Sequence, residues 1–600
     1  MGKWTRRRFL GKSLAAAAGG TVALGSSCIS SHEGTAETPI AERISLDGAW
    51  EFRLDPTGQG ESLGWAKPGA SGEGWEKIIV PHTWQASEKT ASYMGAAWYR
   101  RQLDAPLSWR GHVVRLEFEA VFHTARVWVN GREAGDHVGK GYTAFTVDVT
   151  AHLDLGKVNV IAVRADNSFS PAMLPRGNSY DWAQDGGMTR PVNVLVTGPV
   201  YLESLWIDAV PDPDMTFASL AVRTVVCNAL KEEITVGIGY RITDQSTGLI
   251  ATENQSALEV PVPSGASREI EIPEARLEKP NLWHFDHPHL YLLEAWVTRK
   301  GAPIHSLRTT FGVRAIEVRG QKFFLNGEPV RLMGVERMAG SNPAFGMAEP
   351  APWIDHDHDD LKNLNCVFTR VHWPQDKRVL DDCDRKGILI QLEVPSWGSD
   401  TFKGMNGKPS DEIMANGLEQ LGEMIRRDRN HPCVFSWGLC NEVNGQDPAA
   451  QEFVRRMLKE AKRLDPRRLC SYASNSLQVT PERDVAGAMD FIEWNEYYET
   501  WYGGTPMDMR RNLEMIHHAF PDKPVVISEY GYCACTSDRP ENDERRAAIL
   551  AGHNRVFRDF PWVGGLIFFD YNDYRTHLGD KGLGVLKQRV HGVVDVLGAR

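Results

Sequence analysis

The stretch RDRNHPCVFSWGLCNEVNG, residues 427–445, contains an apolar run that ends on the polar pair Asn441-Glu442. A short apolar run bounded by polar and turn residues is typical of a buried strand. Similar runs recur after residue 314, separated by longer helical patterns such as 411–430, 449–464 and 541–559. We count eight candidate strands: 330–335, 366–372, 388–394, 433–440, 469–474, 491–497, 525–529 and 563–570. This alternation predicts a (β/α)8 barrel, in which chemistry lies at the carboxyl ends of the strands.

Two regions rich in short strands precede the predicted barrel. Between about 41 and 198, alternating segments such as HVVRLEFEAV (112–121) are separated by turns, and Asn130-Gly131 marks a hairpin. This pattern predicts an antiparallel β-sandwich. From about 199 to 313, further strands with turn-rich gaps predict a second, smaller sandwich.

The amino terminus has the pattern of an export signal. The basic segment TRRRFLGKS (5–13) precedes the apolar segment LAAAAGGTVALGSS (14–27), which is too short to span a bilayer. The twin arginines resemble a twin-arginine export signal. We therefore expect residues 1–28 to be a signal peptide and 29–40 a linker, and we expect the protein in the periplasm or at the cell surface.

The cysteines do not form a disulfide framework, because the nine are odd in number and scattered. We expect most of them to be reduced and buried. Cys533 and Cys535 have no second pair at matching spacing, which favours packing over a metal site. Cys28 is a candidate for a lipid anchor, but Gly25 stands where a lipobox has a larger aliphatic residue, so lipidation stays open.

The charge balance excludes one class of partner. The formal net charge is −11, and the first 28 residues contribute basic side chains without any acid, so the remainder is more acidic still. An acidic protein of this kind is not expected to bind nucleic acid.

Two glutamates follow predicted barrel strands. Glu442 falls just past the fourth strand, and Glu529, in KPVVISEYG (523–531), ends the seventh. Because both strand ends face one side of the barrel, we expect the carboxylates to share a cavity although they lie 87 residues apart. Most glycoside hydrolases use two such carboxyl groups to cleave the glycosidic bond. Helix capping or pairing with an arginine would explain one such glutamate, but not readily both.

The segment DRNHPCVFSWGLCNE (428–442) resembles, residue by residue, the acid/base motif of glycoside hydrolase family 2, which includes β-galactosidases, β-glucuronidases and β-mannosidases. The similarity extends to FGVR (311–314), FFLNGEPVRLMGV (323–335), DRKGILIQLEVP (384–395), SEYG (528–531) and DGGMTRPV (185–192). The resemblance spans roughly 41–600. It implies a jelly-roll-like sugar-binding sandwich at 41–198, an immunoglobulin-like sandwich at 199–313 and a catalytic barrel at 314–600.

The resemblance also implies roles for individual residues. Glu442 would be the acid/base and Glu529 the nucleophile of a retaining mechanism, with Asn441 bonded to the sugar 2-hydroxyl. The pKa of the acid should be raised while an ionised nucleophile lies close by. Tyr497 is placed to hydrogen-bond the nucleophile, with Asn495 beside it, and their segment is most similar to the glucuronidase branch.

Four further residues are candidates for substrate contact. His372 matches a second-strand histidine that contacts substrate in the family, although a structural histidine would also fit. Asp181 aligns with an aspartate that reaches the distal hydroxyls of the sugar, and a turn aspartate is the alternative. Trp501 and Trp397 would form stacking platforms or simply pack at the rim.

Several positions depart from the family pattern. The segment GVERMAG (334–340) stands where family members usually carry Asn-Arg-His, so that Glu336 replaces an amide and Met338 a polar group. Arg370 and His372 are one residue closer than usual. Phe569 stands where tryptophan is common.

The Asn-x-Lys pair that reads the substrate carboxylate in the glucuronidase branch is absent beyond the eighth strand. Only LKQRVHG (586–592) lies there, with Lys587 or Arg589 as candidate substitutes. This absence weakens a glucuronidase prediction without refuting it. The 27 residues after Asp573 contain no convincing eighth helix, and whether the chain continues to complete the barrel stays open.

No metal or cofactor is required by these patterns. The run DHDHDD (355–360) precedes a helical segment, and we predict that its acids lie in a first helical turn, where they suit the helix dipole. The galactosidase branch often uses magnesium near the acid/base, but no ligands can be assigned here.

We therefore expect an exo-acting retaining β-glycosidase that removes a terminal sugar from a plant or algal oligosaccharide. β-Galactosyl is the leading candidate, and β-glucuronosyl or a related uronic acid is the alternative. A carbohydrate-binding protein without turnover is the third hypothesis, against which intact Glu442 and Glu529 argue. A homo-oligomer is compatible with the sequence.

Overall fold

The computed structural model describes residues 41–599 except for 71, 73, 177–180, 255–257, 534–538, 577–580 and 584–585. The predicted signal peptide, the linker with Cys28, and Cys535 lie outside the described residues. No described helix is long and apolar enough to cross a membrane. The seven described cysteines are free and six of them are buried, as predicted.

The first region is a sandwich of two antiparallel sheets. Six strands follow the order β3-β2-β4-β9-β6-β7, and four follow the order β1-β10-β5-β8. The predicted hairpin joins β6 to β7, where Asn130 and Gly131 have φ values of 55° and 79°, as this tight turn requires. The strands are β1 Glu42–Ser45, β2 Gly48–Asp55, β3 Glu76–Val80, β4 Ala96–Ala105, β5 Val113–Phe118, β6 Thr124–Val129, β7 Arg132–His137, β8 Phe145–Asp148, β9 Lys157–Asp166 and β10 Val192–Thr197.

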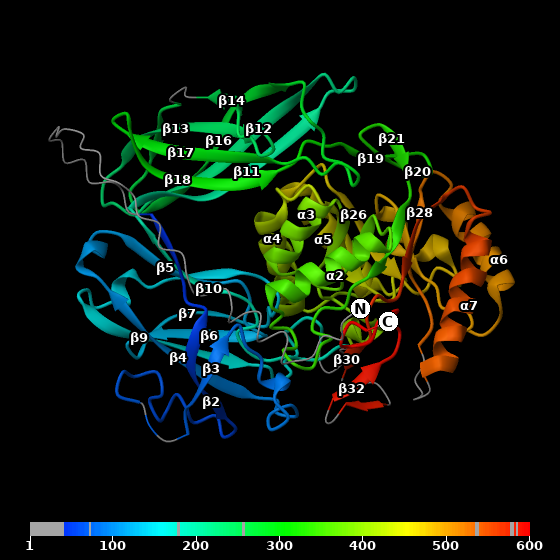
Figure 1. The fold of residues 1–600 in the computed structure, drawn as a ribbon, viewed down its shortest axis with the longest axis horizontal. Coiled ribbons are helices and arrows are strands. Elements are labelled where there is room, and N and C mark those ends of the chain that lie inside the picture. Colours follow the sequence, from blue (N-terminus) through cyan, green and yellow to red (C-terminus); the bar gives the residue numbers. More distant parts are fainter. Residues whose placement is uncertain are drawn as a thin grey trace, which may run out of the picture. The chain divides into compact units, whose positions relative to one another are not determined.

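A second sandwich of strands β11 to β18 follows (Figure 1). One sheet has the order β11-β12-β16, and the other the order β14-β13-β17-β18 with β15 beside β13. Side chains of β12 alternate between buried and half-buried along its whole length, as a strand with one face on a core requires. The strands are β11 Val200–Pro211, β12 Phe217–Asn228, β13 Ile234–Asp244, β14 Ile250–Asn254, β15 Val260–Val262, β16 Ala266–Glu278, β17 Tyr291–Arg299 and β18 Ala302–Phe311.

The third region is a closed barrel of parallel strands in the order β22 to β29. Each of the eight predicted strand segments overlaps one barrel strand, so the predicted fold is confirmed. The strands are β22 Leu332–Glu336, β23 Phe368–Arg370, β24 Leu389–Glu393, β25 Val434–Asn441, β26 Leu469–Ser474, β27 Ile492–Asn495, β28 Val525–Tyr530 and β29 Val563–Phe568. The small sheet before the barrel comprises β19 Ile316–Arg319, β20 Lys322–Leu325 and β21 Glu328–Val330.

Helices connect the barrel strands, and six are described: α2 Ala351–Asn363, α3 Lys377–Lys386, α4 Asp411–Asp428, α5 Pro448–Leu464, α6 Pro506–Ala519 and α7 Arg539–Phe557. After β29 the described chain forms three short strands instead of a helix, as the sequence predicted. These strands, β30 Tyr574–Thr576, β31 Lys581–Leu583 and β32 Leu586–Arg589, pair in the order β30-β32-β31 and are red in Figure 1. The hairpin formed by β31 and β32 returns residues 586–592 toward the barrel.

The prediction for the acidic run 355–360 was wrong. Helix α2 begins at Ala351, with Pro350 as its N-cap, so the run lies in the middle of the helix and its first turn has no acid. The buried Asp357 pairs with Arg337, at 2.8 Å between Oδ2 and Nε. The acids of this run therefore include a partner for a buried cation beside the barrel.

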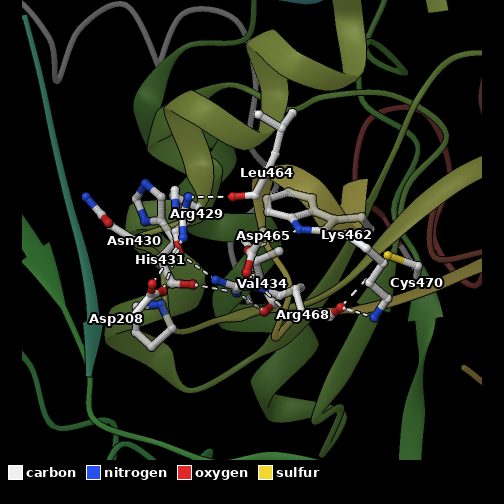
Figure 2. Close-up of polar contacts among 12 residues, drawn as sticks. Asp208, Arg429, Asn430, His431, Val434, Lys462, Leu464, Asp465, Arg468 and Cys470 are labelled. Carbon is white, nitrogen blue, oxygen red and sulfur yellow. Dashed lines mark hydrogen bonds and ion pairs between the residues drawn. The ribbon is translucent and has the colours of Figure 1, made fainter. Parts of the chain in front are cut away.

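The amino end of β25 is fixed by arginines that bind backbone carbonyls (Figure 2). Arg429 donates to the carbonyl of Leu464 at 2.7 Å and lies 3.2 Å from Asp208 of β11. Arg468 donates to the carbonyl of His431 at 3.2 Å and also to that of Val434. Since buried carbonyls need donors, these contacts fix the start of the strand whose other end carries Asn441 and Glu442.

Candidate active site

A cavity of about 270 Å³ lies among residues at the carboxyl ends of the barrel strands. This is just below the range of about 300–1,000 Å³ that is common for drug-sized ligands, and it favours a single sugar over a long chain. Six predicted site residues line it: Asp181, His372, Glu442, Tyr497, Trp501 and Glu529. Trp397, named as a stacking candidate, also lines it, and so do Trp182, Met338, Phe569, Tyr574, Arg589 and His591.

Glu442 directly follows β25 and is half-buried in the cavity wall. Its Oε1 accepts a hydrogen bond from Asn495 Nδ2 at 2.8 Å. Burial, and then the charge of Glu529, raise the pKa of Glu442 to about 7. A carboxyl group with this pKa is protonated in a large fraction of molecules near neutral pH and can serve as a general acid.

Glu529 lies in β28 and is held as an anion. It accepts hydrogen bonds from Arg370 Nη1 at 2.7 Å and from the Tyr497 hydroxyl at 2.6 Å, and His372 Nε2 lies 3.4 Å away. Burial raises the pKa of Glu529, but His372 and Arg370 outweigh it and lower the pKa to about 2. The two glutamates thus hold opposite protonation states around pH 6, as an acid and a nucleophile require.

Asn441 has one polar atom satisfied and the other available. Its Oδ1 accepts from Arg370 Nη2 at 2.8 Å and from Asn495 Nδ2 at 3.1 Å. Its Nδ2 is buried without a hydrogen-bond partner among the described residues. Ser528 donates to Asn495 Oδ1 at 2.7 Å and so fixes the neighbouring amide. The available donor of Asn441 suits a hydroxyl of a bound sugar.

One wall of the cavity joins the loop before β10 to the residues that follow β29. Asp181 accepts from the Tyr574 hydroxyl at 3.1 Å and from Arg589 Nε at 3.0 Å. Burial raises the pKa of Asp181, although Arg589 opposes the rise. The Arg589 guanidinium also lies 5.8 Å from the ring centre of Trp501, whose side chain is 51% exposed. Asp181 is therefore already paired, and Trp501 presents an open aromatic face at the rim.

Three domain models of one family match almost the entire described chain. The sugar binding domain of glycosyl hydrolases family 2 matches residues 44–197, the family 2 domain matches 200–314, and the family 2 TIM barrel domain matches 316–540. The chain belongs to glycoside hydrolase family 2. It is accordingly a glycoside hydrolase, with the fold order that the sequence predicted.

Relatives of this family 2 enzyme carry several activities in their names. A β-glucuronidase of Bacteroides fragilis is 26% identical over 586 residues, which are 91% of this chain and 79% of that protein. A β-galactosidase of Thermoanaerobacter pseudethanolicus is 30% identical over 515 residues, which are 83% of this chain and 63% of that protein.

Solved structures of low sequence identity share the fold of the family 2 enzyme. A β-glucuronidase of Bacteroides uniformis superimposes with a TM-score of 0.82 at 24% identity and covers 93% of this chain and 68% of that chain. A family 2 β-galacturonidase from Eisenbergiella tayi, bound to galacturonate, gives a TM-score of 0.79 at 24% identity over 94% of this chain and 96% of that chain.

Some site residues of the family 2 enzyme were missed from the sequence. Tyr574 and His591 follow β29, and their approach to Asp181 depends on how the terminal hairpin folds back. Burial lowers the pKa of His591 to about 3, so the ring is neutral in the cavity wall. The departures Met338 and Phe569 do line the cavity and make part of its wall apolar. The side chain of Lys587 lies outside the described residues.

Two groups of side chains in the described part of the family 2 enzyme have the spacing of metal ligands, Glu336–His372–Glu529 and Asp384–His431–Cys433. In the first group Arg370 already lies 3.3 Å from Glu336 and 2.7 Å from Glu529. Its guanidinium group therefore already supplies the positive charge between these carboxylates. In the second group, the carboxylate of Asp384 is already hydrogen-bonded to His431 at 2.6 Å and to the backbone N–H of Cys433 at 3.0 Å. We assign a metal ion to neither.

Proposed function

We propose that this family 2 enzyme is a retaining exo-β-glycosidase that releases one terminal sugar by double displacement. The observation that carries the proposal is that Glu442 and Glu529 line one small cavity, where Arg370 and Tyr497 donate hydrogen bonds to Glu529. The cavity size supports exo action, because it accommodates about one sugar ring.

In the first step, a carboxylate oxygen of Glu529 attacks the anomeric carbon and forms a glycosyl ester. The bond to the leaving oxygen breaks, and Glu442 donates its proton to that oxygen. Asn441 Nδ2 donates to the sugar 2-hydroxyl, a contact that strengthens in the transition state. Tyr497 and Arg370 hold Glu529 in place during the attack.

In the second step, Glu442 is ionised and takes a proton from water. The hydroxide so formed bonds to the anomeric carbon as the ester bond to Glu529 breaks. Glu529 leaves as a carboxylate and Glu442 is again protonated. The sugar is released with its original anomeric configuration.

For the sugar we propose a β-linked uronic acid, glucuronosyl or galacturonosyl, in place of the neutral galactosyl favoured from sequence. Arg589 supports this, since it brings a cation to the cavity wall and charge-assisted bonds to carboxylates are strong. Relatives named β-glucuronidase support it as well. β-Galactosyl remains the second candidate: the Asp181–Arg589 pair is neutral overall, and a relative is named β-galactosidase.

A panel of 4-nitrophenyl β-glycosides tests both proposals: galactoside, glucuronide, galacturonide, mannoside, glucoside and arabinopyranoside. Turnover of a uronide that is lost on Glu529→Gln supports mechanism and sugar together. The matched variant Arg589→Gln should lower kcat/KM on uronides by roughly 10²-fold and change neutral substrates far less. Preference for the galactoside would overturn the uronic acid, and silence across the panel would favour the carbohydrate-binding alternative.

We also propose export to the periplasm or cell surface, on the sequence of residues 1–28 alone. Fractionation of cells that express the full chain tests this, with Arg6→Lys and Arg7→Lys together as the matched control. Equal distribution of the two chains would contradict a twin-arginine signal.

A further inference from the structure

Glu336 is a fully buried carboxylate at the end of β22 that contacts both cations beside the nucleophile. Its Oε1 bonds to His372 Nδ1, and its Oε2 lies 3.3 Å from Arg370 Nη1. Both cations also face Glu529, at 2.7 Å from Arg370 and 3.4 Å from His372 Nε2. An amide is usual at the position of Glu336 in the family that the chain resembles.

We infer that Glu336 is a positioning residue that keeps His372 doubly protonated, so that the ring donates to Glu529 throughout the working pH range. This rests on the proposed function, in which Glu529 is the nucleophile. It also changes the expected part of His372, which becomes a fixed donor instead of a ring that can accept a hydrogen bond from a sugar hydroxyl.

The geometry supports this protonation state directly. Each ring nitrogen of His372 lies near a carboxylate oxygen: Nδ1 contacts Glu336, and Nε2 lies 3.4 Å from Glu529. A neutral imidazole has one donor and one acceptor nitrogen, so it would turn a lone pair toward one of the carboxylates. Only the imidazolium donates to both. Burial lowers the pKa of His372, but the charge and hydrogen bond of Glu336 overcome burial and raise the pKa to about 10.

Other charged groups face His372 from the neighbouring elements. They are Arg370 on β23, Glu393 on β24, Glu442 after β25, Glu529 on β28 and Asp181 in the loop before β10. Arg370 opposes protonation of the ring, and the carboxylates favour it. Aromatic rings cover the rest, with Trp182 at 5.5 Å and Phe569 at 6.2 Å between ring centres. Glu336 makes the direct hydrogen bond to His372, so its charge contributes most to keeping the ring protonated.

An amide at position 336 would remove this charge. Burial would then favour a neutral His372, and Glu529 would lose a cation 3.4 Å away. Loss of an adjacent opposite charge raises the pKa of a carboxylate by about 1–3 units. Glu336 and Glu529 have carboxylate oxygens within 4.8 Å of each other, so the loss of the negative charge of Glu336 opposes this rise and reduces it.

Glu336→Gln therefore tests the inference, with Glu393→Gln as the matched control. Glu393 is also buried and bonds Arg370, at 3.0 Å, without a direct contact to His372 in the described structure. On the best substrate of the glycoside panel, the acidic limb of kcat/KM should move to higher pH in Glu336→Gln and by less in Glu393→Gln. An equal shift of the acidic limb in the two variants would overturn the inference.

A second measurement does not depend on turnover. In protein with ¹⁵N-labelled histidine, NMR at pH 8 should show a doubly protonated ring that disappears in His372→Asn and Glu336→Gln and persists in Glu393→Gln. If the wild type lacks this signal, the inference fails even when the enzyme is active. If the signal is present but the panel is silent, only the proposed function fails. Should Glu336→Gln not fold, the comparison of wild type with His372→Asn decides.

Discussion

The two ends of β25 both gather charged and polar side chains, but the groups at the two ends are paired differently. At the amino end, Arg429 and Arg468 bind carbonyls, and Asp384 binds both His431 and a backbone N–H. At the carboxyl end, Asn441 keeps a buried amide donor with no partner in the described structure. Buried polar groups are normally satisfied, so an orphan donor beside a cavity points to a ligand.

The comparison also separates two uses of buried charge. The arginines of the amino end hold the strand to its neighbours, so their removal should lower stability. The glutamates of the carboxyl end differ in protonation, because one is surrounded by cations and the other is buried beside a negative charge. Their removal should lower turnover and leave stability nearly unchanged.

The largest effect is expected for Glu529→Gln. Loss of the nucleophile should lower kcat by roughly 10⁴-fold or more, as for other covalent nucleophiles. The thermal midpoint should stay within a few degrees, since the amide still bonds Tyr497. Initial rates and thermal unfolding on the same preparation measure both. If Glu529→Gln lost both activity and thermal stability, the carboxyl end of β25 would not differ from the amino end in its contribution to stability.

Glu442→Gln should follow, with a loss of about 10²–10⁴-fold on substrates with poor leaving groups. The loss should be smaller with a dinitrophenyl leaving group, which needs no proton, and added azide should restore the second step as a glycosyl azide. Rates with the two leaving groups, with and without azide, measure this. An equal loss on both leaving groups would contradict the role of Glu442 as acid.

Arg468→Met should affect stability instead of turnover. It leaves the carbonyls of His431 and Val434 without this donor and should lower the free energy of unfolding by about 2–4 kcal/mol. Methionine retains apolar contact with Trp437, which lies 5.3 Å from the guanidinium. Urea unfolding and the rate per folded molecule measure the two properties. If Arg468→Met kept its stability and lost turnover, the amino end of β25 would serve catalysis instead of stability, contrary to this comparison.

Asn441→Ala should lower kcat/KM by about 10–10²-fold, the size of a single hydrogen bond that forms fully in the transition state. On a 2-deoxy glycoside the variant and the wild type should differ much less, because the contacted hydroxyl is absent. The ratio of kcat/KM on the two substrates measures the contact. Equal losses on both substrates would show that Asn441 acts through its neighbours instead.

The smallest expected effect is the pH dependence. Glu442 must be protonated for the first step, so kcat/KM should fall about tenfold per pH unit above its pKa of about 7. The stability effect has the same sign: because folding raises the pKa of this carboxyl group from 4.5 to about 7, the free energy of unfolding should fall as the pH rises through this range. In Glu442→Gln the basic limb should be absent. A basic limb that persists in that variant would belong to another group.

The strand pattern and the two glutamates could be predicted because periodicity and strand ends are local properties. The bond of His372 to Glu336 could not, since it depends on side-chain placement across two strands. Nor could the bond of Asp181 to Arg589, which joins residues 408 positions apart through a terminal hairpin. The start of α2 was missed although proline at position 352 marks a first helical turn.

The pairing of Asp181 with Arg589 has a consequence for the synthesis of the chain and for the evolution of its substrate specificity. Asp181 is synthesised before both glutamates and Arg589 after them, so a nascent chain can hold both glutamates and still lack one wall of its pocket. If the proposed function holds, substrate choice resides in these two outer parts of the chain, while bond cleavage resides between them. Changes at either end are then expected to redirect the enzyme to another sugar without any change to its acid or its nucleophile.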